Sequence, residues 1–104
     1  MLSFIIFDCD IRMKIKLFST FREHAGVSSI DLELKERVSV RQVVEILLNT
    51  YPSLQRIWLN ESGELYGHVH ITINQIDVLA QPDGLDTLVG HNDKLDFFPP
   101  ITGG

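Results

Sequence analysis

Cysteine is nearly absent from this sequence of 104 residues. Cys9 is the only one, which excludes a disulfide framework and any site built from four cysteines, such as an iron–sulfur cluster. A chain without disulfides fits the reducing cytosol, so a cytoplasmic location is expected. Cys9 lies before the first regular pattern in the chain, and we predict that it is dispensable.

Positive charge and long apolar runs are also scarce. Nine Lys and Arg against 14 Asp and Glu give a formal net charge of -5, so the chain should not follow the phosphate backbone of a nucleic acid. The acidity fits a partner with a basic docking surface. No apolar run is long enough to span a membrane, and no basic amphipathic stretch favours a membrane surface.

The motifs of self-contained enzymes are missing too. The sequence has no glycine-rich phosphate loop, no Ser/His/Asp set and no HExxH. His68 and His70 share one strand face, but no third ligand is apparent, so no metal site is expected. The length points to one domain with one core and without a deep cleft between lobes. We therefore expect any chemistry to be done with a partner.

The chain divides into three segments. Residues 1–12 lack a positive start and a small-residue cleavage site, which excludes a signal peptide. A clean strand pattern opens at Met13. We therefore assign 1–12 to an extension or a misassigned start, 13–98 to a folded domain and 99–104 to a tail.

One strong helix and several strands are predicted inside the domain. Ser39 and Gln42 have the spacing of a capping box, and Pro52 ends the helix. Its apolar stripe consists of Val40, Val43, Val44, Leu47 and Leu48. Alternation of polar and apolar residues predicts strands at 14–18, 30–34, 68–73, 76–79 and 95–98.

The remaining segments carry weaker signals. Residues 19–26 are predicted to be a connection with one helical turn, and 85–89 a short helix. The region 53–66 gives no clear element, and Trp58 is assigned to a satellite of the core. A hairpin, a crossing helix and a late strand that must pair with earlier ones predict an α+β fold of the β-grasp kind: a mixed sheet with one main helix packed across one face.

The end of the chain carries the strongest functional signal. The last predicted strand is followed by Pro99, Pro100, Ile101, Thr102, Gly103 and Gly104. Two adjacent prolines favour an extended path away from the body. A Gly-Gly end fits a channel too narrow for side chains and leaves the terminal carboxylate open to attack. We infer that Gly104 is the reactive residue and that 99–103 thread into a partner.

Strand geometry gives a second expectation about the same end. Side chains alternate across a strand, so Leu95 and Phe97 should face the core, and Asp96 and Phe98 a wet surface. Phe98 and Asp96 are therefore predicted to bind a partner. A bulge after Phe97 would instead turn Phe98 inward. The late aspartates form either a solvated acidic face or a docking patch; they are Asp83, Asp86, Asp93 and Asp96.

The run from Phe97 to Gly104 resembles the C-terminus of the small subunit of molybdopterin synthase, a sulfur-carrier family with a ubiquitin-like β-grasp fold. Residues 17–26, 69–76 and 92–95 carry further likenesses, so the resemblance covers about 13–104. The Gly-Gly end alone is shared by all ubiquitin-like carriers, whereas Phe-Phe-Pro-Pro is more specific. The stretch 58–66 has no matching motif.

This resemblance implies a two-stage cycle. An E1-like enzyme uses ATP to adenylate the Gly104 carboxylate, and a sulfur donor converts the adenylate to a thiocarboxylate. The tail then enters the large subunit of molybdopterin synthase and gives sulfur to a pyranopterin precursor of the molybdenum or tungsten cofactor. The chain itself binds no cofactor and is not catalytic alone, because the partners supply oxyanion stabilisation and acid–base groups.

Three alternatives stay open at this stage. A protein modifier would join Gly104 to lysines of target proteins, using the same adenylated end. A sulfur carrier for thiamine or cysteine synthesis would share the chemistry, although the Phe-Phe-Pro-Pro run favours the molybdopterin pathway. A non-catalytic interaction module would leave the Gly-Gly end unexplained.

Overall fold

The computed structural model describes residues 11–65 and 69–99; Cys9 and the segment 100–104 lie outside this range. One sheet contains β1 (Ile11–Leu17), β2 (Ser29–Leu34), β4 (His70–Ile73), β5 (Ile76–Asp77) and β7 (Lys94–Phe98). A second, two-stranded sheet contains β3 (Val38–Ser39) and β6 (Leu88–Val89). The helices are α2 (Ser19–Ala25), α3 (Val40–Thr50) and α4 (Gln55–Trp58), with 3-10 turns η1 (Pro52–Leu54), η2 (Val78–Ala80) and η3 (Gly84–Asp86).

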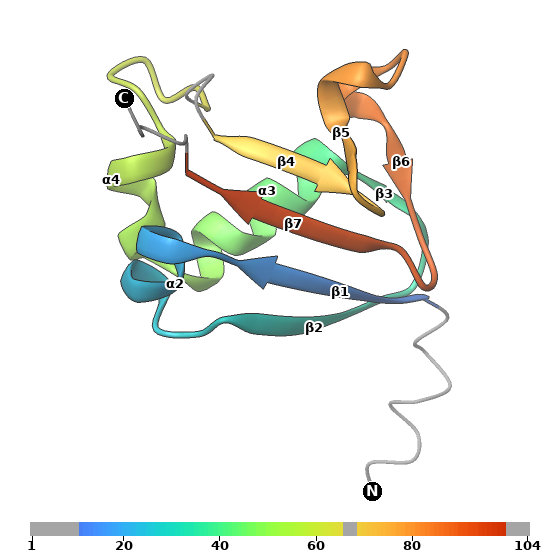
Figure 1. Ribbon diagram of the computed structural model, residues 1–104, viewed down its shortest axis with the longest axis horizontal. Helices are drawn as coiled ribbons and strands as arrows, with labels where there is room; N and C mark the ends of the chain where they lie inside the picture. Colours follow the sequence, from blue (N-terminus) through green and yellow to red (C-terminus); the bar gives the residue numbers. More distant parts are fainter. Residues whose placement is uncertain (1–10, 66–68, 100–104) are drawn as a thin grey trace, which may run out of the picture.

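The main sheet is mixed, with strand order β2-β1-β7-β4-β5. Its only parallel pair among the described residues joins β1 to β7, and its other pairs are antiparallel. Helix α3 crosses one face of this sheet (Figure 1). The predicted α+β fold of the β-grasp kind is thereby confirmed. Strand β7, the last of the described strands in the sequence, is the central strand of the sheet, with β1 on one side and β4 on the other.

Helix α3 forms for the reasons visible in its sequence. The Ser39 hydroxyl accepts a hydrogen bond from the Gln42 backbone amide at 3.1 Å, and the Gln42 side-chain oxygen accepts one from the Ser39 amide at 2.9 Å. This capping box satisfies two backbone donors that would otherwise lack partners. All five predicted stripe residues are buried. The helix therefore covers the sheet with the face that its periodicity predicted.

Trp58 lies in the main core and not in a satellite, so that assignment was wrong. Its ring is fully buried, stacks on Phe97 with centroids 5.0 Å apart, and meets Phe21 edge-on at 5.4 Å. The sequence signal failed because η1 and α4 span only three and four residues, too few to show a helical period.

Two other local predictions need correction. The connection after β1 is a seven-residue helix, α2, which ends at Gly26 with a positive φ of 81°. The helix predicted at 85–89 is absent: η3 ends at Asp86, and Leu88 pairs with Ser39 as part of β6.

The folded domain begins two residues earlier than the sequence pattern placed it. Strand β1 starts at Ile11, whose side chain is 9% exposed and belongs to the core. The Arg12 amide donates a hydrogen bond to the His91 ring at 3.2 Å, and the Arg12 carbonyl accepts one from Asn92 at 2.9 Å. Ile11 and Arg12 therefore belong to the sheet and not to an extension.

We expect a chain that starts at Met13 to be less stable than one in which Met precedes Ile11. The shorter chain loses the burial of one isoleucine side chain, which contributes about 1.5–3 kcal/mol, together with the hydrogen bonds of Arg12. Urea unfolding of both chains measures the difference in free energy of unfolding. Equal midpoints would show that Ile11 contributes nothing to the core.

Candidate functional site

The last strand presents its side chains as the alternation predicted. Leu95 and Phe97 are fully buried on the α3 side of the sheet, whereas Phe98 is half-buried on the opposite, outer face. No inward-turning bulge is present at Phe98, because it remains in β7 and in register with His70. The described chain ends at Pro99; Pro100, Ile101, Thr102, Gly103 and Gly104 lie outside it.

Phe98 packs against Phe18, a residue that sequence reasoning missed. The two ring centroids are 5.2 Å apart, and the Phe18 amide donates a hydrogen bond to the Phe97 carbonyl at 3.1 Å. Phe18 directly follows β1, and the parallel pairing of Leu17 with Phe97 brings the two phenylalanines together. The contact between Phe18 and Phe98 depends on the pairing of two strands that are far apart in the sequence. Alternation of residues within one strand does not predict such a pairing.

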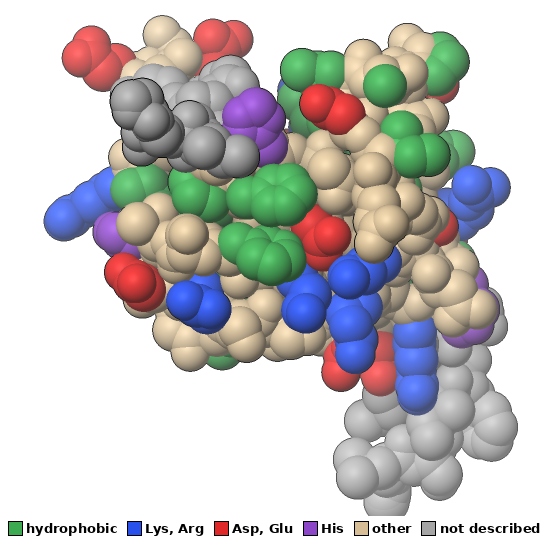
Figure 2. Space-filling model, in the orientation of Figure 1, with side chains coloured by type: hydrophobic (Ala, Val, Ile, Leu, Met, Phe, Trp, Pro, Cys, Tyr) green, Lys and Arg blue, Asp and Glu red, His purple; other side chains and the backbone are tan. Residues whose placement is uncertain are grey.

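Basic and imidazole groups surround this aromatic pair. The Lys16 ammonium lies 5.9 Å from the centroid of the Phe18 ring, a distance at which a cation is attracted by an aromatic face. His70 is exposed and level with Phe98 on the neighbouring strand. We call these four residues, Lys16, Phe18, His70 and Phe98, the outer-face patch. Figure 2 views this face and shows hydrophobic side chains beside basic ones.

Asp96 is not on a wet surface, so that expectation was wrong. Its residue exposure is 7%, and one carboxylate oxygen is buried without a hydrogen-bond partner. The reason is its place in the central strand, level with Lys16 on one side and Thr72 on the other. The Lys94 ammonium is 4.0 Å from that oxygen. A carboxylate shielded in this way is not an exposed docking residue.

The late aspartates do not form one exposed acidic patch in the described structure, since Asp96 is buried and others have partners of their own. Asp93 accepts hydrogen bonds from the Gly90 amide at 2.7 Å and the Asn74 side chain at 3.0 Å. Asp86 pairs with Arg41 at 3.1 Å on another part of the surface. The outer face instead carries four of the nine basic side chains: Arg12, Lys14, Lys16 and Lys94.

The described residues hold neither a metal-binding cluster nor a membrane-spanning helix. No group of three His, Cys, Asp or Glu there is placed to hold a metal ion, and His68 lies outside the described range. No helix in residues 11–65 and 69–99 is both long and apolar enough to cross a membrane.

Almost the whole chain matches the model of a known family. The model of the ThiS family matches residues 15–104, which include the Gly-Gly end. Small archaeal modifier protein 3 of Haloferax volcanii is 32% identical over 94 residues, which make up 90% of this chain and 100% of that protein.

Solved structures of similar proteins share the fold. The crystal structure of small archaeal modifier protein 1 from Haloferax volcanii aligns with a TM-score of 0.77 at 27% identity, over 89% of this chain and 99% of that one. A putative molybdopterin converting factor subunit 1 from Pyrococcus furiosus aligns with a TM-score of 0.69 at 25% identity, over 88% and 100%.

Proposed function

The chain belongs to the ThiS family of ubiquitin-like sulfur carriers and modifiers, and from this premise we propose that Gly104 is adenylated and converted to a thiocarboxylate. The observation that carries the proposal is the tail itself. The Gly-Gly end lies within the family match and follows the central strand of the sheet by only a few residues.

The chemistry divides between this chain and its partners. An E1-like enzyme binds ATP, and the Gly104 carboxylate attacks the α-phosphate with loss of pyrophosphate. The acyl-adenylate is a good electrophile, so hydrosulfide from the sulfur donor attacks the carbonyl carbon, displaces AMP and leaves the thiocarboxylate. This chain contributes the carboxylate and the surface that positions it, while the partner supplies the stabilisation of negative charge on the reacting oxygens.

We assign the recognition step to the outer-face patch. Phe98 ends the strand that continues into the tail, and its contact with Phe18 fixes both rings on the same face. Aromatic residues are enriched among binding hot spots, and Lys16 and His70 add positive or ionisable groups at the rim. The partner surface that receives the tail should therefore combine an apolar pocket with acidic side chains.

The more specific part of the proposal is the reaction in which the thiocarboxylate is used. Entry of the tail into a molybdopterin synthase large subunit, and transfer of sulfur to a pyranopterin precursor, is supported by the Phe-Phe-Pro-Pro run and by the similarity to the Pyrococcus furiosus protein. Conjugation of Gly104 to target lysines is the second candidate. It is supported by the similarity to two small archaeal modifier proteins at 27% and 32% identity.

Intact mass spectrometry separates these outcomes. The protein is incubated with its cognate E1-like enzyme, ATP and a sulfur donor. Replacement of one oxygen by sulfur supports the carrier, whereas higher-mass conjugates on lysines in cells support the modifier. Formation of AMP and pyrophosphate shows that the enzyme is active. If the protein then keeps its unmodified mass, thiocarboxylate formation is contradicted.

Phe98→Ala is expected to weaken binding to the E1-like enzyme by about 2 kcal/mol, the size of a hot-spot truncation, which is roughly a thirtyfold rise in Kd. The cause is loss of the aromatic anchor while the core residues stay in place. Calorimetric titration measures the affinity. Leu88→Ala is the matched control, because Leu88 is 54% exposed on β6 and outside the patch; an equal loss in both variants would contradict the role of Phe98.

A further inference from the structure

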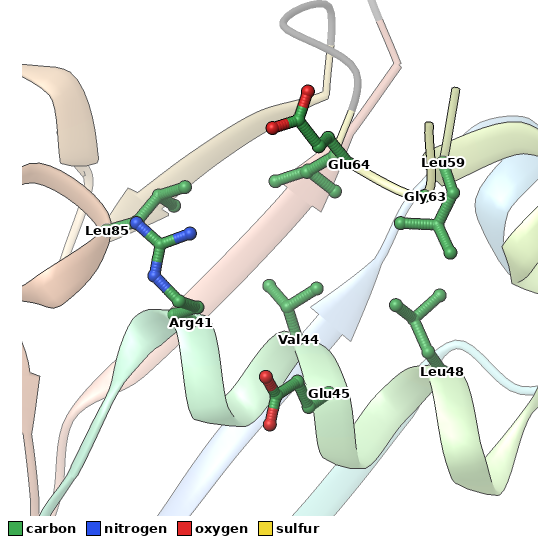
Figure 3. A pocket seen from close by; sticks show the side chains of 9 residues that line it. Arg41, Val44, Glu45, Leu48, Leu59, Gly63, Glu64 and Leu85 are labelled. Carbon is green, nitrogen blue, oxygen red and sulfur yellow. The ribbon is translucent and has the colours of Figure 1, made fainter. Parts of the chain in front are cut away.

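An apolar groove lies beside α3, between this helix and the segments that carry Leu59, Leu65 and Leu85. Its main cleft has a volume of about 460 Å³ and is floored by aliphatic side chains. Val44 and Leu48 project into it from α3, and Leu85 and Leu59 lie at its two sides (Figure 3). A smaller hollow of about 100 Å³ shares Leu65 and Leu85 and extends to β4 and η2.

The composition of the groove favours a protein segment over a small ligand. Small-molecule sites combine apolar walls with a few polar groups that converge on the ligand and orient it. Among the side chains described here, the buried polar atoms without partners belong to Trp58, Thr72 and Asp96, and none of these residues lines the groove. The groove therefore offers apolar burial without internal polar recognition.

Negative charge surrounds this apolar floor. Glu45 and Glu64 line the main cleft, and Asp77 lines the smaller hollow. All three are exposed, and none forms an ion pair with another described residue. Arg41, the one Lys or Arg of the lining, is paired with Asp86 at 3.1 Å, and the smaller hollow also borders His70. The rim is thus net negative.

We propose that this acidic-rimmed groove docks a segment of a second protein that carries at least two aliphatic side chains flanked by Lys or Arg. The aliphatic side chains fill the floor, and the basic ones meet Glu45, Glu64 and Asp77. Complementary charge at a rim mainly sets the association rate and the choice of partner, whereas the buried apolar contacts hold the complex.

The main cleft is distinct from the outer-face patch, because none of its lining residues belongs to that patch. The smaller hollow borders the patch through His70, so simultaneous occupancy is expected for the main cleft. A partner in the groove is therefore a further protein beyond the E1-like enzyme and the synthase subunit of the proposed function. Binding at the groove should be unaffected by deletion of Gly104, which separates a failure of this inference from a failure of the sulfur-carrier proposal.

The test uses synthetic peptides as probes with the full chain. One peptide has two leucines four residues apart flanked by lysines, a second has glutamates in place of the lysines, and a third has serines in place of the leucines. Methyl NMR spectra are expected to show the first peptide shifting the methyl signals of Val44, Leu48 and Leu85, and the other two leaving them in place. Shifts confined to the outer face, or no shifts, would overturn the proposal.

Charge reversal supplies the matched control. Glu45→Lys combined with Glu64→Lys should weaken the lysine–leucine peptide about tenfold or more, since attraction at the rim becomes repulsion. Glu23→Lys combined with Glu36→Lys makes the same change in net charge at exposed positions outside the groove and should leave the affinity nearly unchanged. Equal weakening of peptide binding in both double variants would show that net charge alone sets the affinity, and it would contradict docking at this rim. Methyl shifts that grow with protein concentration alone would instead assign the groove to a second copy of this chain.

Discussion

Deletion of Gly104, or addition of one residue after it, is expected to abolish thiocarboxylate formation entirely. In the proposed function the reacting group is the terminal carboxylate. An added residue would move that carboxylate beyond the Gly-Gly end and would place a side chain where the proposed partner channel fits none. Activity is measured as the gain of sulfur in intact mass after incubation with the E1-like enzyme, ATP and a sulfur donor. The melting temperature should not change, because the last strand ends at Phe98.

A tail variant that preserves the carboxylate gives the control for this result. Thr102→Ala keeps Gly103 and Gly104, and this variant should still be converted to the thiocarboxylate. If only changes at Gly104 abolish conversion, the cause is the loss of the reacting carboxylate and not a general defect in binding of the tail. A chain with an uncleaved C-terminal tag that still restores sulfur transfer would contradict the role of Gly104.

Phe97→Ala is expected to lower the free energy of unfolding by about 3–5 kcal/mol, as for truncation of a buried phenylalanine. The ring is fully buried and stacks on Trp58 with centroids 5.0 Å apart, and Trp58 in turn contacts Phe21. Its removal therefore leaves a cavity in the centre of the aromatic core. Single domains have free energies of unfolding of about 5–15 kcal/mol, so this one change should remove a large share of that free energy. Urea unfolding provides the measurement.

Phe98→Ala serves as the neighbouring control in the same experiment. Phe98 is half-buried on the other face, where its ring packs against Phe18 and not in the core. Its unfolding midpoint should stay close to that of the unchanged chain. If Phe98→Ala unfolds as early as Phe97→Ala, then both rings are core residues and the outer-face patch is not a free surface.

The parts of the fold that follow from local periodicity were predictable. Helix α3 needed only its capping box and apolar stripe, and β7 only its alternation, so the burial of Leu95 and Phe97 followed from the sequence. The five-stranded mixed sheet followed from the order of the elements. Trp58 could not be placed, because the short elements η1 and α4 carry no period of their own.

The candidate site depended more on contacts between distant segments. Asp96 looked exposed because strand alternation takes no account of neighbours on both sides of a central strand, and Lys16 and Thr72 are those neighbours. Phe18 went unnoticed because its contact with Phe98 follows from the parallel pairing of β1 and β7. The role of the tail stays a prediction, because it rests on residue type and position in the sequence and residues 100–104 lie outside the described structure.

The pairing of β1 with β7 also determines when the domain can complete its fold during synthesis. Lys14 pairs with Lys94, so almost the whole domain must leave the ribosome before the centre of the sheet can close. Contacts between such distant residues form slowly, and until then β1 has an unpaired edge that can join other chains. The Gly-Gly end follows the strand that completes the sheet by only a few residues. A chain terminated before β7 therefore lacks both the closed sheet and the Gly-Gly end, and an activating enzyme that requires both will not charge it.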